Sequence, residues 1–163
     1  MTWNTPDTWT TGQLVTAEDL NLQLRDNLNY VHSGKPLAGI ARSAGSDYQT
    51  NSGTLVDIDG TNLKATFTTT TGRILIAFSG TFYADGAARL LNLDVDVDGA
   101  LMGPSGMVKE VLDAAPRLVT FVVAKTGLSN GSHTVKVKWT VGGGWAYLFS
   151  DSSCQVHLTV WEL

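Results

Sequence analysis

The sequence predicts a mainly β protein, an antiparallel jelly-roll sandwich with one N-terminal α-helix. Hydrophobic residues make up 43% of the 163 residues and charged residues only 16%. Much of the surface is therefore left to Thr, Ser, Asn and Gly, which suit strands and turns. From residue 37 onward, short β-rich runs alternate apolar and polar side chains, with turn signals between them and no helical pattern among them. Seven or eight short strands of this kind are typical of a sandwich or jelly roll.

The chain is expected to divide near Ser33-Gly34-Lys35-Pro36. Gly34 can end a helix, and Pro36 prevents the helix from resuming. We therefore predict an N-terminal docking arm with a helix over residues 1–36, and an antiparallel β jelly-roll domain over residues 37–163.

The predicted helix of the arm begins at Thr16. Its hydroxyl can accept a hydrogen bond from a free backbone N–H of the first turn, and Asp19 stands three residues later as the partner of a capping box. Val15 and Leu20 have the spacing of a hydrophobic staple. One apolar stripe then recurs every three or four residues, as in an amphipathic helix. Its members are Leu20, Leu24, Leu28 and Val31.

The arm also has two tryptophans, Trp3 and Trp9, in a segment too short to bury them alone. A helix of this length is marginal in isolation, so its apolar side chains need a surface to contact. They either pack back on the chain's own β-domain, or contact another subunit or another protein. We predict the second alternative. The candidate docking residues are Trp3, Trp9, Leu20, Leu24 and Leu28.

The β-domain is predicted from seven runs rich in β-branched and aromatic residues. The runs are Thr54–Ile58, Leu63–Thr68, Arg73–Phe78, Leu91–Val97, Leu118–Val123, His133–Trp139 and Cys154–Trp161. Turn signals separate them at Asp59-Gly60, Thr71-Gly72, Asp98-Gly99, Asn130-Gly131 and Gly142-Gly143-Gly144. The alternation implies one buried face per strand, and we expect the C-terminal strand to be paired inside a sheet.

Asp94, Asp96 and Asp98, followed by Gly99, match the opening of a calcium loop of the EF-hand type. That loop needs a bidentate Glu at its twelfth position, where this chain has Ser105, and helices on both sides. The competing interpretation is a strand with Val95 and Val97 inward and the three Asp outward, ending in an Asp-Gly hairpin turn. We predict the strand and no metal; these three aspartates are weak candidates for a calcium site between subunits.

No set of residues predicts catalysis or a cofactor. Three scattered histidines, His32, His133 and His157, lack the ligand spacing of a zinc site, and we expect strand-surface or subunit-contact roles for the two in strands. Cys154 has no nearby basic residue that would activate it, so we expect a buried, inert thiol. The segment 103–106 is not the Gly-x-Ser-x-Gly nucleophile elbow, and there is no phosphate-binding glycine loop. We predict that the protein is not an enzyme.

Charge and hydropathy give no reason to expect nucleic-acid or membrane partners. The formal net charge is −4, so no broad basic surface is predicted for nucleic acid or anionic lipid. No apolar run approaches the roughly 18 residues of a transmembrane helix. The N-terminus lacks the basic start and apolar stretch of a signal peptide, and we expect no export by the standard route.

The arm resembles an N-terminal signature of tailed-bacteriophage virion proteins. The matching residues are Trp9, Gly12, Val15-Thr16-Ala17, Leu20-Asn21 and Arg25-Asp26-Asn27-Leu28. The C-terminal part resembles jelly-roll domains of the tumour-necrosis-factor and complement-head kind, which occur in phage fibres and capsid decorations. Its matching segments are Gly127–Trp139 and Leu158–Leu163.

This resemblance implies a structural virion protein, a homotrimer made in the bacterial host cytoplasm and located in the virion. We expect a capsid decoration or head-fibre protein whose arm docks on the major capsid protein or another virion protein. The alternative is a tail-associated (tail-fibre-like) receptor-binding or carbohydrate-binding protein that contacts a host-surface glycan. Trp145 and Tyr147 are then the candidate glycan contacts, although their alternation with Ala146 and Leu148 is equally that of a strand.

Overall fold

The computed structural model describes residues 7–28, 36–86, 88–103 and 106–163. The chain falls into two compact units, Met1–Lys35 and Pro36–Leu163. Each unit is described by itself.

The first unit begins its helix where the capping residues predict it. Helix α1, Ala17–Leu20, has Thr16 as its N-cap. The Thr16 hydroxyl accepts from the Asp19 backbone N–H at 3.1 Å, and the Asp19 carboxylate accepts from the Thr16 backbone N–H at 2.9 Å. The predicted capping box is therefore confirmed, with Asp in place of the usual Glu or Gln.

The predicted continuous α-helix is wrong in one respect. After Leu20 the chain continues as a π-helix, η1, over Asn21–Asp26. Within this segment, Gln23 forms two hydrogen bonds with Asp7. The Asp7 backbone N–H donates to Gln23 Oε1 at 3.3 Å, and Gln23 Nε2 donates to Asp7 Oδ2 at 3.2 Å. The periodicity could not show the change, because an apolar residue every third or fourth position fits either kind of turn. Val31 and the predicted stop at Ser33-Gly34 lie outside the described residues.

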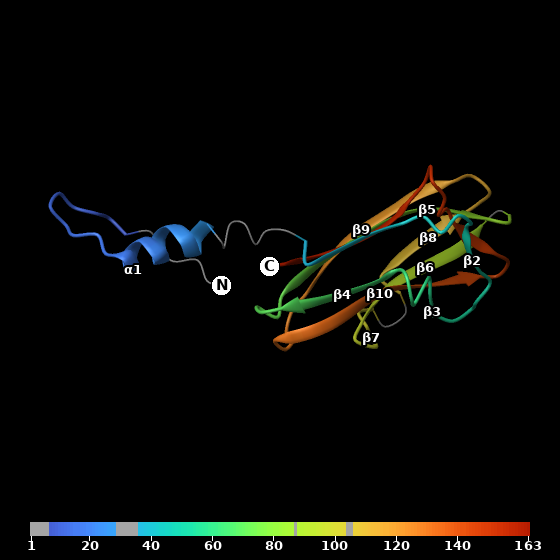
Figure 1. Ribbon diagram of the computed structural model, residues 1–163. Helices are drawn as coiled ribbons and strands as arrows, with labels where there is room; N and C mark the ends of the chain where they lie inside the picture. The colour runs from blue at the N-terminus through green and yellow to red at the C-terminus, as the bar shows by residue number, and fades with distance from the viewer. Residues whose placement is uncertain (1–6, 29–35, 87, 104–105) are drawn as a thin grey trace. The chain divides into compact units, whose positions relative to one another are not determined.

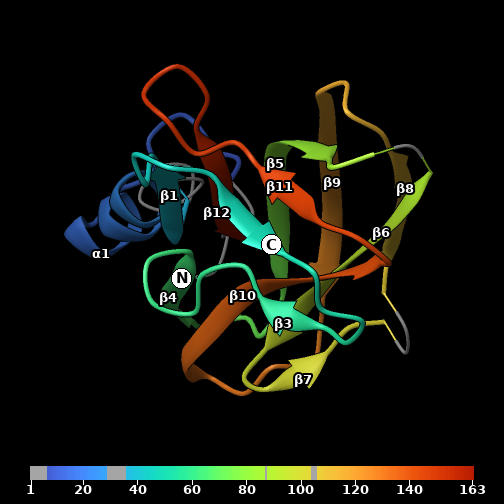
Figure 2. The ribbon, with the colours of Figure 1, turned by 90° about the vertical axis from the view of Figure 1, so that its right-hand side faces the viewer.

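The second unit is a sandwich of two antiparallel six-stranded sheets (Figures 1 and 2). The first sheet contains β1 (Ala38–Arg42), β2 (Tyr48–Thr50), β5 (Ile74–Ala84), β9 (Arg117–Lys125), β11 (Ala146–Leu148) and β12 (Val156–Glu162). The second sheet contains β3 (Val56–Asp57), β4 (Lys64–Thr69), β6 (Arg89–Val97), β7 (Ala100–Leu101), β8 (Val108–Leu112) and β10 (Gly131–Gly142).

The strand order is that of a jelly roll. The first sheet runs β1-β12-β5-β9 and the second β4-β10-β6-β8, with the shorter strands continuing these rows. Strands distant in sequence are thus neighbours, as β1 and β12 show by pairing Ala38 with Val160. The predicted fold class, a mainly β antiparallel jelly roll with one short N-terminal helix, is confirmed.

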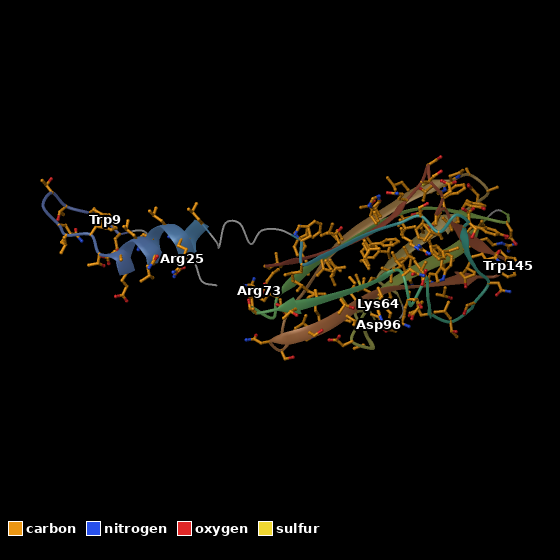
Figure 3. The ribbon with its side chains drawn as sticks, in the orientation of Figure 1. Trp9, Arg25, Lys64, Arg73, Asp96 and Trp145 are labelled. Carbon is orange, nitrogen blue, oxygen red and sulfur yellow. The ribbon has the colours of Figure 1, made fainter. Side chains whose placement is uncertain are left out.

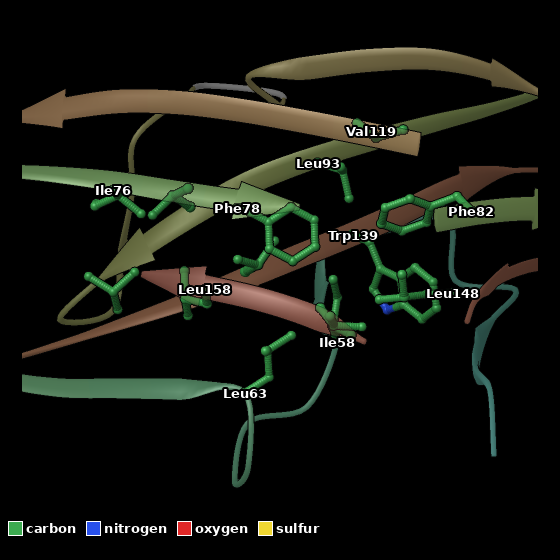
Figure 4. Close-up of a cluster of buried hydrophobic side chains, with 14 of the residues drawn as sticks. Ile58, Leu63, Ile76, Phe78, Phe82, Leu93, Val119, Trp139, Leu148 and Leu158 are labelled. Atoms are coloured by element: carbon green, nitrogen blue, oxygen red, sulfur yellow. The ribbon is translucent and has the colours of Figure 1, made fainter. Parts of the chain in front are cut away.

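The hydrophobic core lies between the two sheets (Figure 4). Along β5 every second side chain points into it, among them Ile76, Phe78 and Phe82. Trp139 of β10 is buried and meets the Phe82 ring edge-on, with centroids 6.2 Å apart. Burying an aliphatic or aromatic side chain of this size stabilises a fold by roughly 1.5–3 kcal/mol. Every buried hydrophobic residue of the described chain belongs to the second unit.

The predicted strands are present, with different ends. The run Arg73–Phe78 is the start of β5, which continues to Ala84 because both its edges are paired. The run Thr54–Ile58 shrinks to the two residues of β3. Strands β1, β2, β7 and β8 were not predicted, because their short segments carry little alternation.

Candidate interaction surfaces

The outer face of the first sheet is the side that points away from the core. Its register brings together Gly39 and Ala41 of β1, Gln49 of β2, Leu75, Ala77, Ser79, Thr81 and Tyr83 of β5, Leu118, Thr120, Val122 and Ala124 of β9, Tyr147 of β11, and His157, Thr159 and Trp161 of β12. None of these outward positions is Asp, Glu, Lys or Arg. Leu118 is 69% exposed and Val122 is 59% exposed.

The outer face of the second sheet has the opposite character. There Asp57 of β3 accepts from Lys136 at 2.8 Å and from Lys138 at 2.6 Å, both on β10. Lys138 also lies 3.6 Å from the carboxylate of Asp96 on β6. Paired charges of this kind are usual on a solvated surface. The two faces of the sandwich therefore differ sharply in charge.

Stacked aromatic rings extend the outer face of the first sheet toward β11. The Tyr83 and Tyr147 rings stack with centroids 4.7 Å apart and planes 12° apart, and Phe149 adds a third ring 4.8 Å from Tyr83. The Tyr83 hydroxyl donates to Asp47 Oδ2 at 2.8 Å. Burial, and then this carboxylate, raise the pKa of Tyr83 to about 12. Tyr147, a candidate glycan contact from sequence, is thus one member of this stack.

The three aspartates of the calcium-like sequence do not all face solvent as expected. Val95 and Val97 point inward and Asp98-Gly99 forms the predicted hairpin turn, both residues having positive φ. Asp94 and Asp96, however, are buried, because the segment after this turn covers them. The Gly103 N–H donates to Asp94 Oδ1 at 3.1 Å, and the Gly99 N–H donates to Asp96 Oδ1 at 2.7 Å. In the part of the chain that the structure describes, no three His, Cys, Asp or Glu residues are grouped so that they could hold a metal ion.

His133 and Cys154 also differ from expectation. His133 was expected on a strand surface or at a subunit contact, and within this chain its ring is buried between Asp98 and the Ser129 carbonyl. Cys154 was expected to be a buried thiol that starts a strand. It is only partly buried, in the turn before β12, where its backbone N–H donates to Asp151. His157 lies exposed on β12 as expected, and His32 is outside the described residues.

The candidate docking residues of the arm are exposed within their unit. The exposed fraction is 36% for Trp9, 45% for Leu20, 56% for Leu24 and 65% for Leu28. Leu14, which was not among the predicted docking residues, is the most exposed of the large apolar residues in the described ranges. Trp3 lies outside the described residues. No helix within the described ranges is long and apolar enough to cross a membrane.

Trp145, the other candidate glycan contact, lies at one end of the β-domain (Figure 3). Its carbonyl accepts from the Asp85 backbone N–H at 3.1 Å. The Asp85 carboxylate pairs with Arg89 at 3.0 Å. The sequence alone did not indicate these two charged residues, because only the fold brings residue 145 beside residue 85. The glycine run 142–144 was the available signal.

Comparisons with known proteins concern the fold alone. No protein-family model matches the chain, and no curated protein sequence matches it significantly. Among solved structures, Eiger TNF from S. frugiperda is 12% identical over 79% of this chain and 94% of that chain, with a TM-score of 0.46. The globular domain of zebrafish complement 1qA is 15% identical over 79% of this chain and 98% of that chain, with a TM-score of 0.43. A protein of infectious bursal disease virus, Gt strain, is 14% identical over 80% and 38%, with a TM-score of 0.46. Likenesses at this level do not extend to ligands, partners or activity.

Proposed function

We propose that this chain is a non-enzymatic structural protein of a bacteriophage virion, a homotrimer that serves as a capsid decoration or head-fibre protein. Its β-domains associate through the outer face of the first sheet. Its N-terminal unit docks on the major capsid protein or another virion protein.

The observation that carries the proposal is the uncharged outer face of the first sheet. A solvated sheet face normally holds charged side chains, as the second sheet does with Asp57, Lys136 and Lys138. Interface cores are depleted in charge and enriched in aromatic residues, and the first sheet carries Tyr83, Tyr147 and Trp161 at its outward positions.

A second copy of the same chain is the occupant that fits this face. The chain has a net charge of −4, so two copies carry like net charge and repel each other overall. The strand positions of this outer face hold no Asp, Glu, Lys or Arg, and the Asp47 carboxylate, which precedes β2, accepts a hydrogen bond from the Tyr83 hydroxyl. The face can therefore meet its own copy without like charges being buried together. Three copies, and a virion as their location, follow the resemblance of the sequence to phage proteins.

The exposed apolar residues of the first unit support a docking role. Trp9, Leu20, Leu24 and Leu28 are exposed within their unit, and the capping box and the Asp7–Gln23 hydrogen bonds hold this unit in shape. Tryptophan is enriched among interface hot spots, and a preorganised segment loses less conformational entropy when it binds.

The assembly face can be tested with Val122→Asp. Val122 lies on β9 in the outer face and is 59% exposed, so the substitution leaves the core untouched. In an assembly it would bury a carboxylate against apolar side chains, which is strongly unfavourable. Light scattering coupled to size exclusion should give about 52 kDa for the native protein, three times the chain mass of 17.4 kDa. The variant should give the mass of a single chain.

Val111→Asp is the matched control. Val111 is 54% exposed on β8, on the second sheet, and the same substitution there should leave the mass unchanged. A native protein that runs as a monomer at micromolar concentration would refute self-assembly in solution. A native oligomer that Val111→Asp dissociates and Val122→Asp does not would place the interface on the other sheet.

A further inference from the structure

The β-domain has two ends, and its first residue, Pro36, lies at one of them. The next residue, Leu37, donates its N–H to the Val160 carbonyl at 2.7 Å. That is the end of the first sheet at which β5 starts, beside Arg73. Strand β5 then runs the length of the sheet to Ala84, next to Asp85 and Trp145. Figure 3 shows Arg73 and Trp145 at opposite ends of the domain.

The end with Trp145 has a cluster of polar and aromatic groups that we call the distal cluster: Asp85, Arg89 and Trp145. The Arg89 Nε donates to Asp85 Oδ1 at 3.0 Å, and both side chains remain about one third exposed. Trp145 is 38% exposed.

Gly144 is required where it stands. Its φ is +68°, and a Cβ there would lie 2.5 Å from Arg89 Nε and 2.6 Å from Asp85 Oδ1. Any side chain at 144 would therefore displace the ion pair. The absence of a side chain at Gly144 lets the Asp85–Arg89 pair pack directly against the backbone that leads to Trp145.

Most polar atoms of the distal cluster are available to a ligand. Within the described residues, the Arg89 guanidinium donates only through Nε, and the Asp85 carboxylate accepts only through Oδ1. The two terminal nitrogens of Arg89 and Asp85 Oδ2 thus remain as donors and an acceptor, and the indole N–H of Trp145 is a further donor. Asp85 and Arg89 thus offer donors and an acceptor next to Trp145, whose backbone carbonyl accepts from the Asp85 N–H and whose side chain is partly exposed.

We propose that the distal cluster binds a neutral pyranose sugar. The Trp145 ring offers a flat apolar surface for the C–H face of a sugar ring, while Asp85 and Arg89 bond its hydroxyl groups. A hydroxyl both donates and accepts, so adjacent hydroxyls match a carboxylate beside a guanidinium. The ion pair is neutral as a whole, which favours an uncharged sugar over an acidic one, whose carboxylate Asp85 would repel. This sugar-binding function goes beyond the proposed assembly function and does not depend on it.

The test is a titration of the full-length protein with three methyl pyranosides, of gluco, galacto and manno configuration. Ligand-observed NMR should detect saturable binding of at least one of them, with a dissociation constant on the order of 1 mM for so small a site. Trp145→Ala and Arg89→Gln should each raise that constant about tenfold or more. Trp145 lies in the turn before β11 and Arg89 is the first residue of β6, both partly exposed, so circular dichroism should show an unchanged fold.

Two matched variants serve as controls. Trp9→Ala removes an equally exposed tryptophan from the other unit, and Arg73→Gln removes an exposed arginine from the opposite end of the β-domain. Both should leave the affinity unchanged. Saturable binding to none of the three pyranosides would overturn the proposal, as would binding that Trp145→Ala and Arg89→Gln leave intact. Tighter binding of methyl glucuronide than of its neutral counterpart would overturn the ligand class. Light scattering on the same samples measures the oligomeric mass and so tests the assembly proposal separately.

Discussion

The ring of His133 has a hydrogen-bond acceptor at each of its two nitrogens. Nδ1 lies 2.6 Å from Asp98 Oδ2, and Nε2 lies 2.8 Å from the Ser129 carbonyl oxygen. A neutral imidazole has one N–H and can satisfy only one of them, whereas the imidazolium satisfies both. The hydrogen bond to Asp98, and then that to Ser129, raise the pKa of His133 above its ordinary 6.5.

This pair predicts a loss of stability as the pH rises. The folded-state pKa of His133 is raised. The stabilisation that its charged ring gains from Asp98 and Ser129 is therefore fully present below about pH 6.5 and is lost as the pH rises through the folded-state pKa. Asp98→Asn removes the charged partner and suits the positive φ at that turn. Denaturant unfolding should show a larger stability difference between native protein and variant at pH 5.5–6 than at pH 9. An equal difference at both pH values would mean that His133 is neutral throughout.

At the scale of elements, one carboxylate joins the last strand to the hairpin between β4 and β5. Glu162 Oε1 accepts from the backbone N–H groups of Thr70 and Thr71, at 2.5 and 2.7 Å, and from the Thr69 hydroxyl at 2.8 Å. Burial alone would raise the pKa of Glu162, but these hydrogen bonds outweigh it and lower the pKa to about 2. The end of β12 is thereby tied to a segment more than ninety residues earlier.

Glu162→Gln should weaken this connection while keeping an acceptor oxygen. We expect a loss of about 1–2 kcal/mol at neutral pH, the difference between hydrogen bonds to a charged and to a neutral acceptor. Because the folded-state pKa is depressed, the native protein should lose this stability as the pH falls from 4.5 toward 2, and the variant should not. Chemical denaturation across that range measures it. Glu110→Gln, on β8, is the control and should change little; a Glu162→Gln variant no less stable at pH 7 would contradict the assignment.

At the scale of the whole molecule, the β-domain has a hydrophobic core of its own. All the buried hydrophobic residues within the described ranges lie between Ile58 and Val160. Deleting residues 1–36 should therefore leave a soluble domain that unfolds cooperatively, as circular dichroism would record. The deleted form should keep its oligomeric state, because the proposed assembly face belongs to the β-domain, but it should no longer join virions. Trp9→Ala should weaken incorporation and barely change melting.

The outcome of this deletion separates the roles of the two units. An unfolded or aggregated product would mean that residues 1–36 belong to the fold, and the docking proposal would lose its main support. A folded product that still joins virions normally would place the attachment surface on the β-domain. Co-sedimentation with virions measures incorporation.

Local chemistry alone determined the fold class, the capping box and the hairpin at Asp98-Gly99. Strand alternation, an N-cap hydroxyl and an Asp-Gly turn each depend on residues close together in the sequence, so they can be recognised without the fold. The exposed tryptophan and leucines of the arm were likewise found from their spacing. What the arm contacts stays a prediction.

Only the tertiary structure decided which polar residues are buried and which surfaces exist. Asp94 and Asp96 alternate with core valines like solvent-facing residues, yet the chain after Gly99 covers them. The uncharged outer face joins strands that are distant in sequence, and so does the distal cluster, where Asp85 meets Trp145. Long-range pairing brings these residues together, and such pairing depends on how whole strands bury their apolar faces. No local pattern of residues contains that information.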